Sequence, residues 1–269
     1  MSIGPATMTT ALTDENRAKL KRVSTATLTT ALFKRGFRNQ FIQDVRPLNP
    51  AAPRMVGEAY TLRYIPARED LDHLGVFEDW EHPQRKAVEE CPPGHVMVID
   101  SRKDPRAASA GGILISRLHQ RGVAGIVTDG GFRDSPEIAA MDFAVYHNRP
   151  SAPTNLIRHH ATDINVPIGC GDVPVFPGDI VVGDAEGVVV IPAHLANEIA
   201  AETYEQTAFE DFVEEKVREG RTIFGLYPAN EATKAEFKAW RPGWKQRTGR
   251  PGLNALRPLP PPAAAASAG

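Results

Sequence analysis

The segment from Val96 to Thr128 constrains the fold of this chain more than any other part of its sequence. A short apolar run at 96–100 follows a Pro-Pro-Gly turn, a helical pattern starts at Gly111 and stops at Gly122, and a second apolar run covers 123–128. Strand, helix and strand within about thirty residues form a βαβ unit, and such a crossover joins two parallel strands. The sequence therefore predicts an α/β fold with a parallel strand pair near its centre.

Further strands and helices are predicted on both sides of this unit. β-Branched and aromatic residues without a helical period indicate a strand over 55–64. Val and Ile runs at 180–182 and 188–191 flank Asp-Ala-Glu-Gly, a connection that contains glycine, and predict a β-hairpin. The other expected elements are short strands over 143–146 and 164–168 and helices over 14–21, 24–35, 84–90, about 194–218 and 230–240.

Charge and hydropathy exclude several classes of partner. Lys and Arg number 31 against 33 Asp and Glu, so the net charge of −2 lacks the basic excess of a protein that tracks nucleic-acid phosphates. The longest apolar run, 187–192, is far shorter than the roughly 20 residues that span a bilayer. The N-terminal segment has no secretory leader pattern, and Cys91 and Cys170 form no metal motif and suit a reducing compartment. We therefore expect a cytoplasmic protein with no nucleic-acid or membrane partner.

Two loops predicted to lie at one edge of the sheet carry the residues best suited to chemistry. Ligands of open parallel sheets collect at the carboxyl ends of the strands, where loops lead into helix N-termini. Gly111 and Gly112 open the helix that follows the strand over 96–100, and their unobstructed backbone N–H groups could bind a carboxylate or a phosphate. The alternative for this glycine pair is a turn without a ligand.

The second loop places Arg133 and Asp134 shortly after the strand over 123–128. An arginine can hold a carboxylate through two parallel N–H bonds, and a carboxylate oxygen can bind a hard divalent cation. An organic acid that bridges both side chains would explain their adjacency. The alternative is an exposed ion pair, which contributes little to stability.

Both loops belong to longer motifs that resemble those of a known family. The run Gly111-Gly112-Ile113-Leu114, continued by the stretch from Arg121 to Asp134, is similar to the central motif of the RraA-like proteins. A second stretch, 175–192, also resembles that family. The family contains the class II 4-hydroxy-4-methyl-2-oxoglutarate aldolases and the regulators of ribonuclease E activity. The resemblance covers about residues 23–220.

The resemblance implies a fold and a division of the chain. The implied architecture is α/β, a layered β/β/α fold with a central mixed sheet, similar to the swivelling phosphohistidine domain. The implied parts are an N-terminal extension over 1–22, an RraA-like catalytic domain over 23–220, and a C-terminal helix with a Pro/Ala-rich arm over 221–269. Because family members assemble as homotrimers or homohexamers with sites near subunit interfaces, the same assembly is expected here.

The resemblance also implies roles for the residues of the two loops. Arg133 would hold the pyruvyl part of a 2-oxo acid substrate, and Asp134 would anchor Mg²⁺ or Mn²⁺, partly through water. The implied activity is a metal-dependent carbon–carbon lyase, a 4-hydroxy-2-oxo acid aldolase or an oxaloacetate decarboxylase, in which the cation stabilises an enolate and pyruvate is the product. The substrate-binding residues would be Gly111, Gly112, Ile113, Leu114 and Arg133, with backbone N–H groups receiving the C1 carboxylate.

One position departs from the family pattern. Family aldolases carry an acidic residue one position after the helix-opening glycine, where this chain has Gly112, which can neither accept a proton nor hold a water ligand through a side chain. His147, after the strand over 143–146, is the best replacement general base by residue type, because imidazole titrates near neutral pH. The alternative is that His147 is structural. The other side chains expected near the same edge are Asp129, Glu137, Asn148 and Arg149.

The remaining polar residues are interpreted as structural. His159 and His160 are adjacent on one element and therefore point in different directions, which disfavours a metal pair. Lys103 is the lysine nearest the two loops and is expected to be an exposed loop charge, so Schiff-base catalysis is disfavoured. Asp179, Asp184 and Glu186 are expected to serve turns, and the acidic residues between 72 and 82 a solvated insertion rather than a lid.

Two alternatives to the aldolase or decarboxylase hypothesis stay open. The missing acid at Gly112 makes a related reaction on the same site credible, namely dehydration or hydration of a 2-oxo-3-deoxy sugar acid. The second alternative is a non-catalytic regulator that binds an RNA-processing enzyme, as some relatives do. Dependence of pyruvate formation on a divalent cation would separate an enzyme from such a binding protein.

Overall fold

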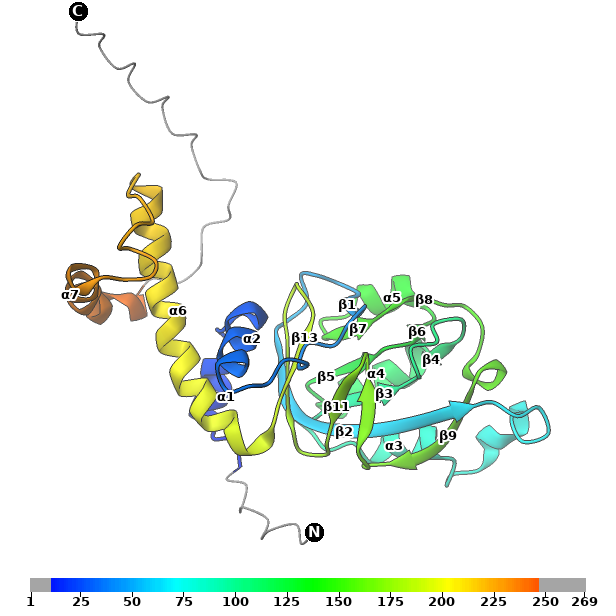
Figure 1. Cartoon of the computed structure of the whole chain (residues 1–269). Coiled ribbons are helices and arrows are strands. Elements are labelled where there is room, and N and C mark those ends of the chain that lie inside the picture. Colours follow the sequence, from blue (N-terminus) through cyan, green and yellow to red (C-terminus); the bar gives the residue numbers. More distant parts are fainter. Residues whose placement is uncertain (1–10, 247–269) are drawn as a thin grey trace, which may run out of the picture. The chain divides into compact units, whose positions relative to one another are not determined.

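The computed structural model describes residues 11–246, and the chain divides into two compact units, one ending at Tyr204 and the other beginning at Glu205 (Figure 1). This division falls inside helix α6 (Ala196–Arg218). The predicted arm beyond residue 246 and the first ten residues of the predicted extension lie outside the described residues. No helix in the described part of the chain has the length and apolar character needed to cross a membrane.

An eight-stranded mixed sheet forms the centre of the first unit. Strands β2, β3, β5 and β7 pair in parallel, and the β3–β5 pair among them is the one that the βαβ pattern predicts. Strands β1, β9, β12 and β13 join antiparallel. The long strand β2 pairs with three neighbours in turn, β12 at its start and β3 and β9 further along. The strands are β1 (Arg46–Pro47), β2 (Met55–Pro66), β3 (Val96–Asp100), β5 (Gly125–Thr128), β7 (Val145–His147), β9 (His159–Ile164), β12 (Ile180–Gly183) and β13 (Val188–Ile191).

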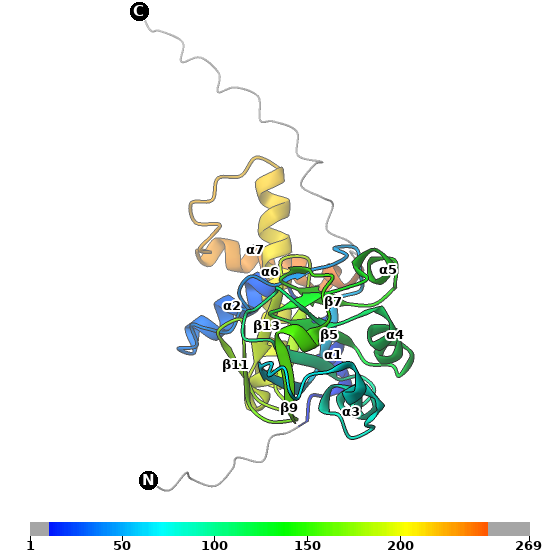
Figure 2. The ribbon, with the colours of Figure 1, turned by 90° about the vertical axis from the view of Figure 1, so that its right-hand side faces the viewer.

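The central strands are mostly buried, because both faces of the sheet are covered. Met97 and Ile99 of β3 pack under the helices α3 (Pro83–Glu90), α4 (Gly112–Gln120) and α5 (Ser135–Ala139), which lie side by side with α4 in the middle (Figure 2). Val96 and Val98 face the opposite way, towards the hairpin of β10 (Ile168–Cys170) and β11 (Val173–Val175). Helices, sheet and hairpin thus form the predicted layers.

A small parallel sheet that the sequence did not reveal carries the loops of interest. Its strands are β4 (Ala108–Ala110), β6 (Gly131–Phe132) and β8 (Arg149–Pro150). Strands of two or three residues are too short to show a period in the sequence. Helix α4 therefore begins after β4 rather than directly after β3, and α5 follows β6 rather than β5.

Helices α1 (Asp14–Leu20) and α2 (Thr25–Lys34) cover the β12–β13 hairpin together with the first turns of α6. Leu20, Leu28 and Ile199 are fully buried in the cluster that these elements share with Val189 and Ile191. The two helices begin at side-chain caps, because Thr13 and Ser24 accept hydrogen bonds from the backbone N–H of Asn16 and Thr27. The predicted cap at Asp14 is therefore wrong by one residue.

Several predicted boundaries also differ from those observed. The predicted strand over 164–168 is wrong, since β9 ends at Ile164 and β10 starts at Ile168. Asn165 between them adopts a left-handed backbone (φ 55°) that no strand continues. Strand β7 begins at Val145, two residues after the predicted start. The long helix α6 begins at Ala196, after the 3₁₀ turn η3 (Ala193–Leu195).

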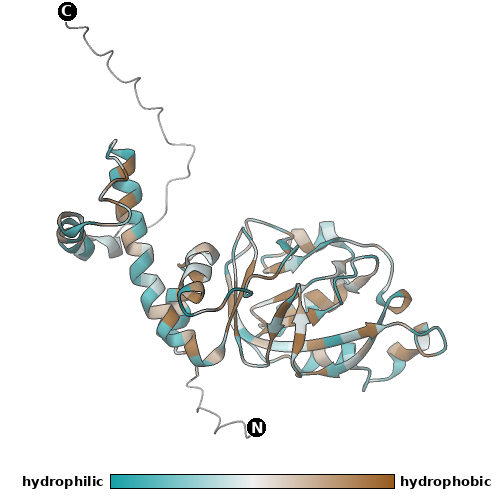
Figure 3. Cartoon of the chain, viewed as in Figure 1, coloured by the Kyte–Doolittle hydropathy of each residue, from teal (hydrophilic) through white to brown (hydrophobic). Residues whose placement is uncertain are grey.

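The second unit contains the end of α6, α7 (Glu231–Trp240) and the 3₁₀ turn η4 (Arg241–Gln246). Asn230 caps α7 by accepting a hydrogen bond from Thr233 N, as the sequence predicts. In Figure 3, apolar (brown) segments occur among the polar (teal) ones along α6. This unit contains an aromatic cluster formed by Phe209, Phe212, Phe237 and Trp240.

Candidate functional site

A pocket of about 110 Å³ lies where α4 begins and the β6–α5 turn approaches it. It brings together Gly111, Ile113, Leu114, Arg133 and Asp134, which the sequence predicts to bind substrate or metal. Gly112, between them, donates its backbone N–H to the Asp134 carboxylate. The other lining residues are Phe77 of the 3₁₀ turn η1 (Leu74–Glu78), Gln84 and Arg85 of α3, Ala108 and Ala110 of β4, Thr154, and Asn155 of the 3₁₀ turn η2 (Asn155–Ile157).

The Asp134 carboxylate lies at the N-terminus of α4. Asp134 adopts a left-handed backbone (φ 61°, ψ 35°), which Asp tolerates better than most side chains, immediately before α5. This turn carries its Oδ2 to 2.9 Å from the backbone N of Gly112. The positive end of the α4 dipole and the free N–H groups of its first turn favour negative charge there, from the protein or from a ligand.

Arg133 and Asp134 lie side by side at the pocket and remain about half exposed. The Nε of Arg133 is 3.7 Å from Asp134 Oδ2, which leaves the guanidinium without a tight hydrogen bond to that carboxylate. Gly111 makes this arrangement possible. A Cβ atom at position 111 would lie 2.9 Å from both Arg133 Nε and Asp134 Oδ2, so any larger residue would displace the two side chains.

Gly112 is less constrained than Gly111. A Cβ atom there would meet the Cβ of Asp134 at 3.3 Å, and its nearest neighbours all belong to that side chain. Position 112 therefore faces the Asp134 carboxylate. An acidic side chain at position 112, as in the family pattern, would lie close to that carboxylate. Its absence leaves Asp134 as the single carboxylate among the residues that line the pocket.

Arg85 is a pocket residue that sequence reasoning missed. Its guanidinium carbon lies 4.3 Å from the centroid of the Phe77 ring. Burial lowers the pKa of Arg85, and the positive charge of Arg133 lowers it further. The sequence places Arg85 in a helix far from the glycine and arginine motifs, and no local signal predicts that α3 packs beside α4.

His147 does not line the pocket. It is 6% exposed, stacks on Phe132 with ring centroids 5.8 Å apart, and has no hydrogen-bond partner for Nδ1 within the described part of the chain. Burial lowers the pKa of His147 to about 4, so the imidazole is neutral at pH 7. This placement fits the structural alternative, and its role as a general base stays a prediction from sequence.

Replacing His147 by Phe is expected to make the protein more resistant to acid. The folded pKa of about 4 lies below the unfolded value near 6.5, so the His147 contribution to stability is complete above about pH 6.5 and is lost as pH falls towards 4. Phenylalanine does not bind a proton, so the variant does not lose this stability at low pH. The difference in unfolding free energy between variant and wild type should therefore grow by about 2–3 kcal/mol between about pH 7.5 and pH 4.5. Urea denaturation at both pH values measures it.

Because all other titrating groups are shared, the wild-type chain is the control. Parallel stability curves for the two proteins would contradict the assigned burial of His147. Pyruvate release by the same variant tests the general-base hypothesis, since a loss near a hundredfold in a folded variant would support it.

The other candidates at this edge of the sheet also lie outside the pocket lining. Asp129 is buried and accepts backbone N–H groups of Ser101, Lys103 and Gly171, which ties the ends of β3 and β5 to the β10–β11 turn. Burial raises the pKa of Asp129 to about 6. Glu137 and Arg149 are exposed, and Asn148 donates its backbone N–H to Gly130.

The residues interpreted as structural are placed accordingly. His159 is buried against Tyr64, whereas His160 on the same strand pairs with Asp72, so the two imidazoles do not converge. Lys103 pairs with Asp172. The Asp179 and Asp184 carboxylates accept backbone N–H groups of the turns around them.

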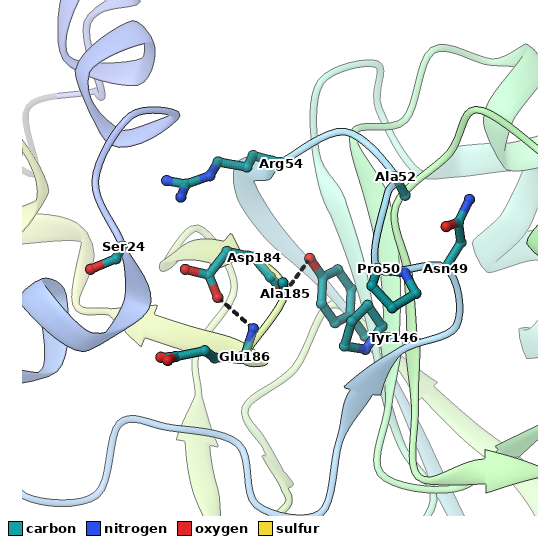
Figure 4. A pocket seen from close by; sticks show the side chains of 10 residues that line it. Ser24, Asn49, Pro50, Ala52, Arg54, Tyr146, Asp184, Ala185 and Glu186 are labelled. Atoms are coloured by element: carbon teal, nitrogen blue, oxygen red, sulfur yellow. Dashed lines mark hydrogen bonds between the residues drawn. The ribbon is translucent and has the colours of Figure 1, made fainter. Parts of the chain in front are cut away.

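A second, larger pocket of about 370 Å³ lies beside the β12–β13 hairpin (Figure 4). Several of its polar groups already have hydrogen-bond partners within the protein. The Asp184 carboxylate accepts hydrogen bonds from the Thr25 N–H and hydroxyl and from the Glu186 N–H, and Tyr146 donates to the Asp184 carbonyl. Arg54 donates to the Val23 carbonyl. The smaller pocket is therefore the better candidate site, because Arg85 has no carboxylate partner among the described residues and Arg133 makes only a loose contact with Asp134.

Comparisons with known proteins point to one family and one fold. A family model described as RraA-like, Aldolase/RraA, matches residues 25–190. A Halalkalibacterium halodurans protein with the provisional name 4-hydroxy-4-methyl-2-oxoglutarate aldolase is 36% identical over 148 residues, which cover 55% of this chain and 64% of the relative. The chain thus spans less than two thirds of that relative's length.

Two solved structures share the fold. A Pseudomonas syringae pv. tomato protein with 22% identity matches 81% of this chain and 99% of its own with a TM-score of 0.69, a likeness of fold alone. Streptomyces coelicolor RraAS2, described as an unusual member of the RNase ES inhibitor RraA protein family, is 27% identical and matches 76% of this chain and 98% of its own with a TM-score of 0.67. The predicted α/β fold with a central mixed sheet is confirmed.

Proposed function

Because the chain belongs to the RraA-like family, we propose that it is a divalent-metal-dependent lyase that acts on a 2-oxo acid and releases pyruvate through an enolate. The observation that carries the proposal is the meeting of Arg133, Asp134 and the N-terminus of α4 at one pocket. Cationic, anionic and N–H groups there can bind the carboxylate and the 2-oxo group of one small acid.

The substrate carboxylate is bound by the first turn of α4 and by Arg133. The first N–H groups of a helix have no partner within the helix, and Ile113 and Leu114 supply two of them at the pocket. Arg133 can add two parallel N–H bonds to the same acid. Together these donors orient the 2-oxo group towards Asp134.

Asp134 is suited to hold a divalent cation. One of its oxygens is fixed by Gly112, while the described residues supply no hydrogen-bond donor to Oδ1. No group of three or more His, Cys, Asp or Glu in the described part of the chain could form an all-protein metal cage. A single carboxylate such as Asp134 suits Mg²⁺ or Mn²⁺, because Mg²⁺ commonly uses one or two carboxylates with waters and the substrate as its other ligands. When bound, the cation polarises the 2-oxo group and stabilises enolate charge.

The acid and base groups that line the pocket favour decarboxylation over retro-aldol cleavage. A retro-aldol reaction requires a base to take the proton of the 4-hydroxyl group, whereas a β-oxo acid such as oxaloacetate loses CO₂ without that step. Asp134 is the one carboxylate among the lining residues, which include no imidazole, and position 112 supplies no acid. Oxaloacetate is therefore the substrate that these residues support best, with 4-hydroxy-2-oxo acids second.

A non-catalytic regulator of a ribonuclease is the second candidate. It is favoured by the likeness to Streptomyces coelicolor RraAS2, which comes from an inhibitor family. In that case Arg133 and Asp134 would be retained parts of the fold, and binding of a ribonuclease would be indifferent to chelators. Carbon–carbon bond cleavage would be absent.

The test is pyruvate release, coupled to lactate dehydrogenase, from oxaloacetate and from 4-hydroxy-2-oxo acids with Mg²⁺ or with EDTA. Since free Mg²⁺ itself promotes oxaloacetate decarboxylation, the rate without protein is subtracted. We expect enzyme-dependent release that EDTA abolishes, fastest with oxaloacetate. Absence of release from every substrate would contradict the lyase and direct the search to dehydration of 2-oxo-3-deoxy sugar acids or to a ribonuclease partner.

A further inference from the structure

The candidate site contains more positive charge than a single carboxylate and a cation-binding aspartate require. Arg85 and Arg133 both line the pocket, and Asp134 is the one acidic side chain beside them. Within the described residues, Arg85 forms no ion pair with any carboxylate, and its guanidinium lies over the ring of Phe77. An arginine that is partly withdrawn from water and faces a second arginine lacks a counter-charge, and an anionic ligand would supply one.

Two buried amide atoms beside Arg85 also lack partners. Gln84 is 2% exposed, and its Nε2 donates to Tyr64 Oη and to the Ser109 carbonyl, which fixes the amide and leaves Oε1 without a donor in the described structure. Asn155 is 5% exposed, and its Nδ2 has no hydrogen-bond acceptor among the described residues. Both residues line the pocket. Because buried polar atoms are nearly always hydrogen-bonded, these two atoms point to a ligand with both acceptor and donor groups.

We propose that Arg85 and Asn155 bind a second oxyanion group of the substrate, distinct from the carboxylate held by Arg133, and that Arg85 thereby determines specificity. This inference rests on the proposed function and assigns the far end of a 2-oxo acid longer than oxaloacetate, such as a 4-hydroxy-2-oxo acid, because the carboxylate that oxaloacetate loses as CO₂ is not one that an arginine could usefully hold. Arg85 supplies charge and a planar pair of donors, and Asn155 Nδ2 adds a neutral donor. Gln84 Oε1 accepts a hydrogen bond from a hydroxyl group next to the anion. A carboxylate and a phosphonate or phosphate share this chemistry.

Binding of unreactive 2-oxo acids to the Mg²⁺-loaded protein tests the assignment. 2-Oxoglutarate and 2-oxopentanoate differ only in a terminal carboxylate against a methyl group, and 4-phosphono-2-oxobutanoate presents a phosphonate instead. Isothermal titration calorimetry should show 2-oxoglutarate or the phosphonate binding roughly tenfold to a hundredfold more tightly than 2-oxopentanoate. Which of the two anions binds more tightly identifies the natural group.

Variants of α3 provide the matched comparison. In Arg85→Gln the ratio of the affinity for an anionic acid to the affinity for 2-oxopentanoate should fall to about one. Arg85→Lys keeps the charge without the planar fork and should keep part of this preference. Lys86→Gln removes the same charge from the next residue, which pairs with Glu81 and does not line the pocket, and should keep the wild-type preference. Partial rescue by Lys also shows that loss in the Gln variant is not misfolding.

The outcomes separate the two proposals. If wild type and Arg85→Gln bind pyruvate but show the same preference between 2-oxoglutarate and 2-oxopentanoate, the assignment of Arg85 is overturned and the proposed function stands. If Lys86→Gln loses the preference for anionic acids as fully as Arg85→Gln does, the assignment of Arg85 is also overturned, because the net positive charge of α3 would then explain the effect. If the wild-type protein binds no 2-oxo acid, pyruvate included, both proposals fail.

Discussion

Replacing Arg133 by alanine is expected to lower kcat/KM for pyruvate formation by at least a hundredfold. Arg133 is half exposed at the pocket, has no tight hydrogen bond to Asp134, and is therefore available to a substrate carboxylate. Loss of two charge-assisted N–H bonds costs about 3 kcal/mol or more, which corresponds to roughly a hundredfold. Initial rates over a range of oxaloacetate concentrations, corrected for the metal-only rate, measure the effect.

The matched control for this prediction is Arg117→Ala. Arg117 lies on the same helix-bearing face, in α4, but pairs with Glu89 and does not line the pocket. Such an exposed pair contributes little to stability, so activity should stay near that of the wild type. Arg133→Lys should fall between the wild type and alanine, since lysine keeps the charge and loses the planar fork. Activity of Arg133→Ala within a few fold of the wild type would contradict the proposed binding mode.

Replacing Asp134 by asparagine is expected to abolish activity at low Mg²⁺ concentration. Asparagine keeps the size of the side chain and can still accept the Gly112 N–H through Oδ1, so the turn before α5 should be preserved. It removes the one carboxylate at the pocket, which is the charge that would hold a hard cation. We expect the Mg²⁺ concentration at half-maximal activity to rise at least about tenfold, and the rate below it to fall roughly a hundredfold.

A Mg²⁺ titration of pyruvate release measures this shift, and Glu137→Gln is the control. Glu137 lies three residues further along, in the first turn of α5, is exposed, and does not line the pocket. Its removal should leave the Mg²⁺ dependence close to that of the wild type. An Asp134→Asn protein with a wild-type Mg²⁺ dependence would show that the cation, if used, is held elsewhere.

The chemistry-bearing loops were predictable from the sequence because their signals are local. Gly111 opens a helix where a Cβ atom would clash, and Arg133 and Asp134 follow a buried strand by a few residues. Parallel strands 96–100 and 125–128 bring the two loops to one edge of the sheet, which the βαβ pattern required. The family motif reinforced the same residues. The small sheet of β4, β6 and β8, which carries the two loops, was not predicted.

The residues that surround these loops were not predictable in the same way. His147 has the side-chain chemistry of a base and follows a predicted strand, yet that strand's pairing places it in the interior against Phe132. Arg85 lies in a helix whose own sequence says nothing about ligands, and it reaches the pocket because α3 packs beside α4. Asn155 arrives there through a 3₁₀ turn without a sequence pattern.

The sequence by itself thus determined the α/β class, the parallel core and the Arg133–Asp134 loop over a glycine-opened helix, because strand, helix and turn signals depend on neighbouring residues. The tertiary structure alone decided which distant side chains complete the pocket. Helix packing brings Arg85 and Gln84 to it, and sheet pairing withdraws His147 from water. Such contacts join residues far apart in the chain, and their free energy comes from burial and packing that no local pattern records.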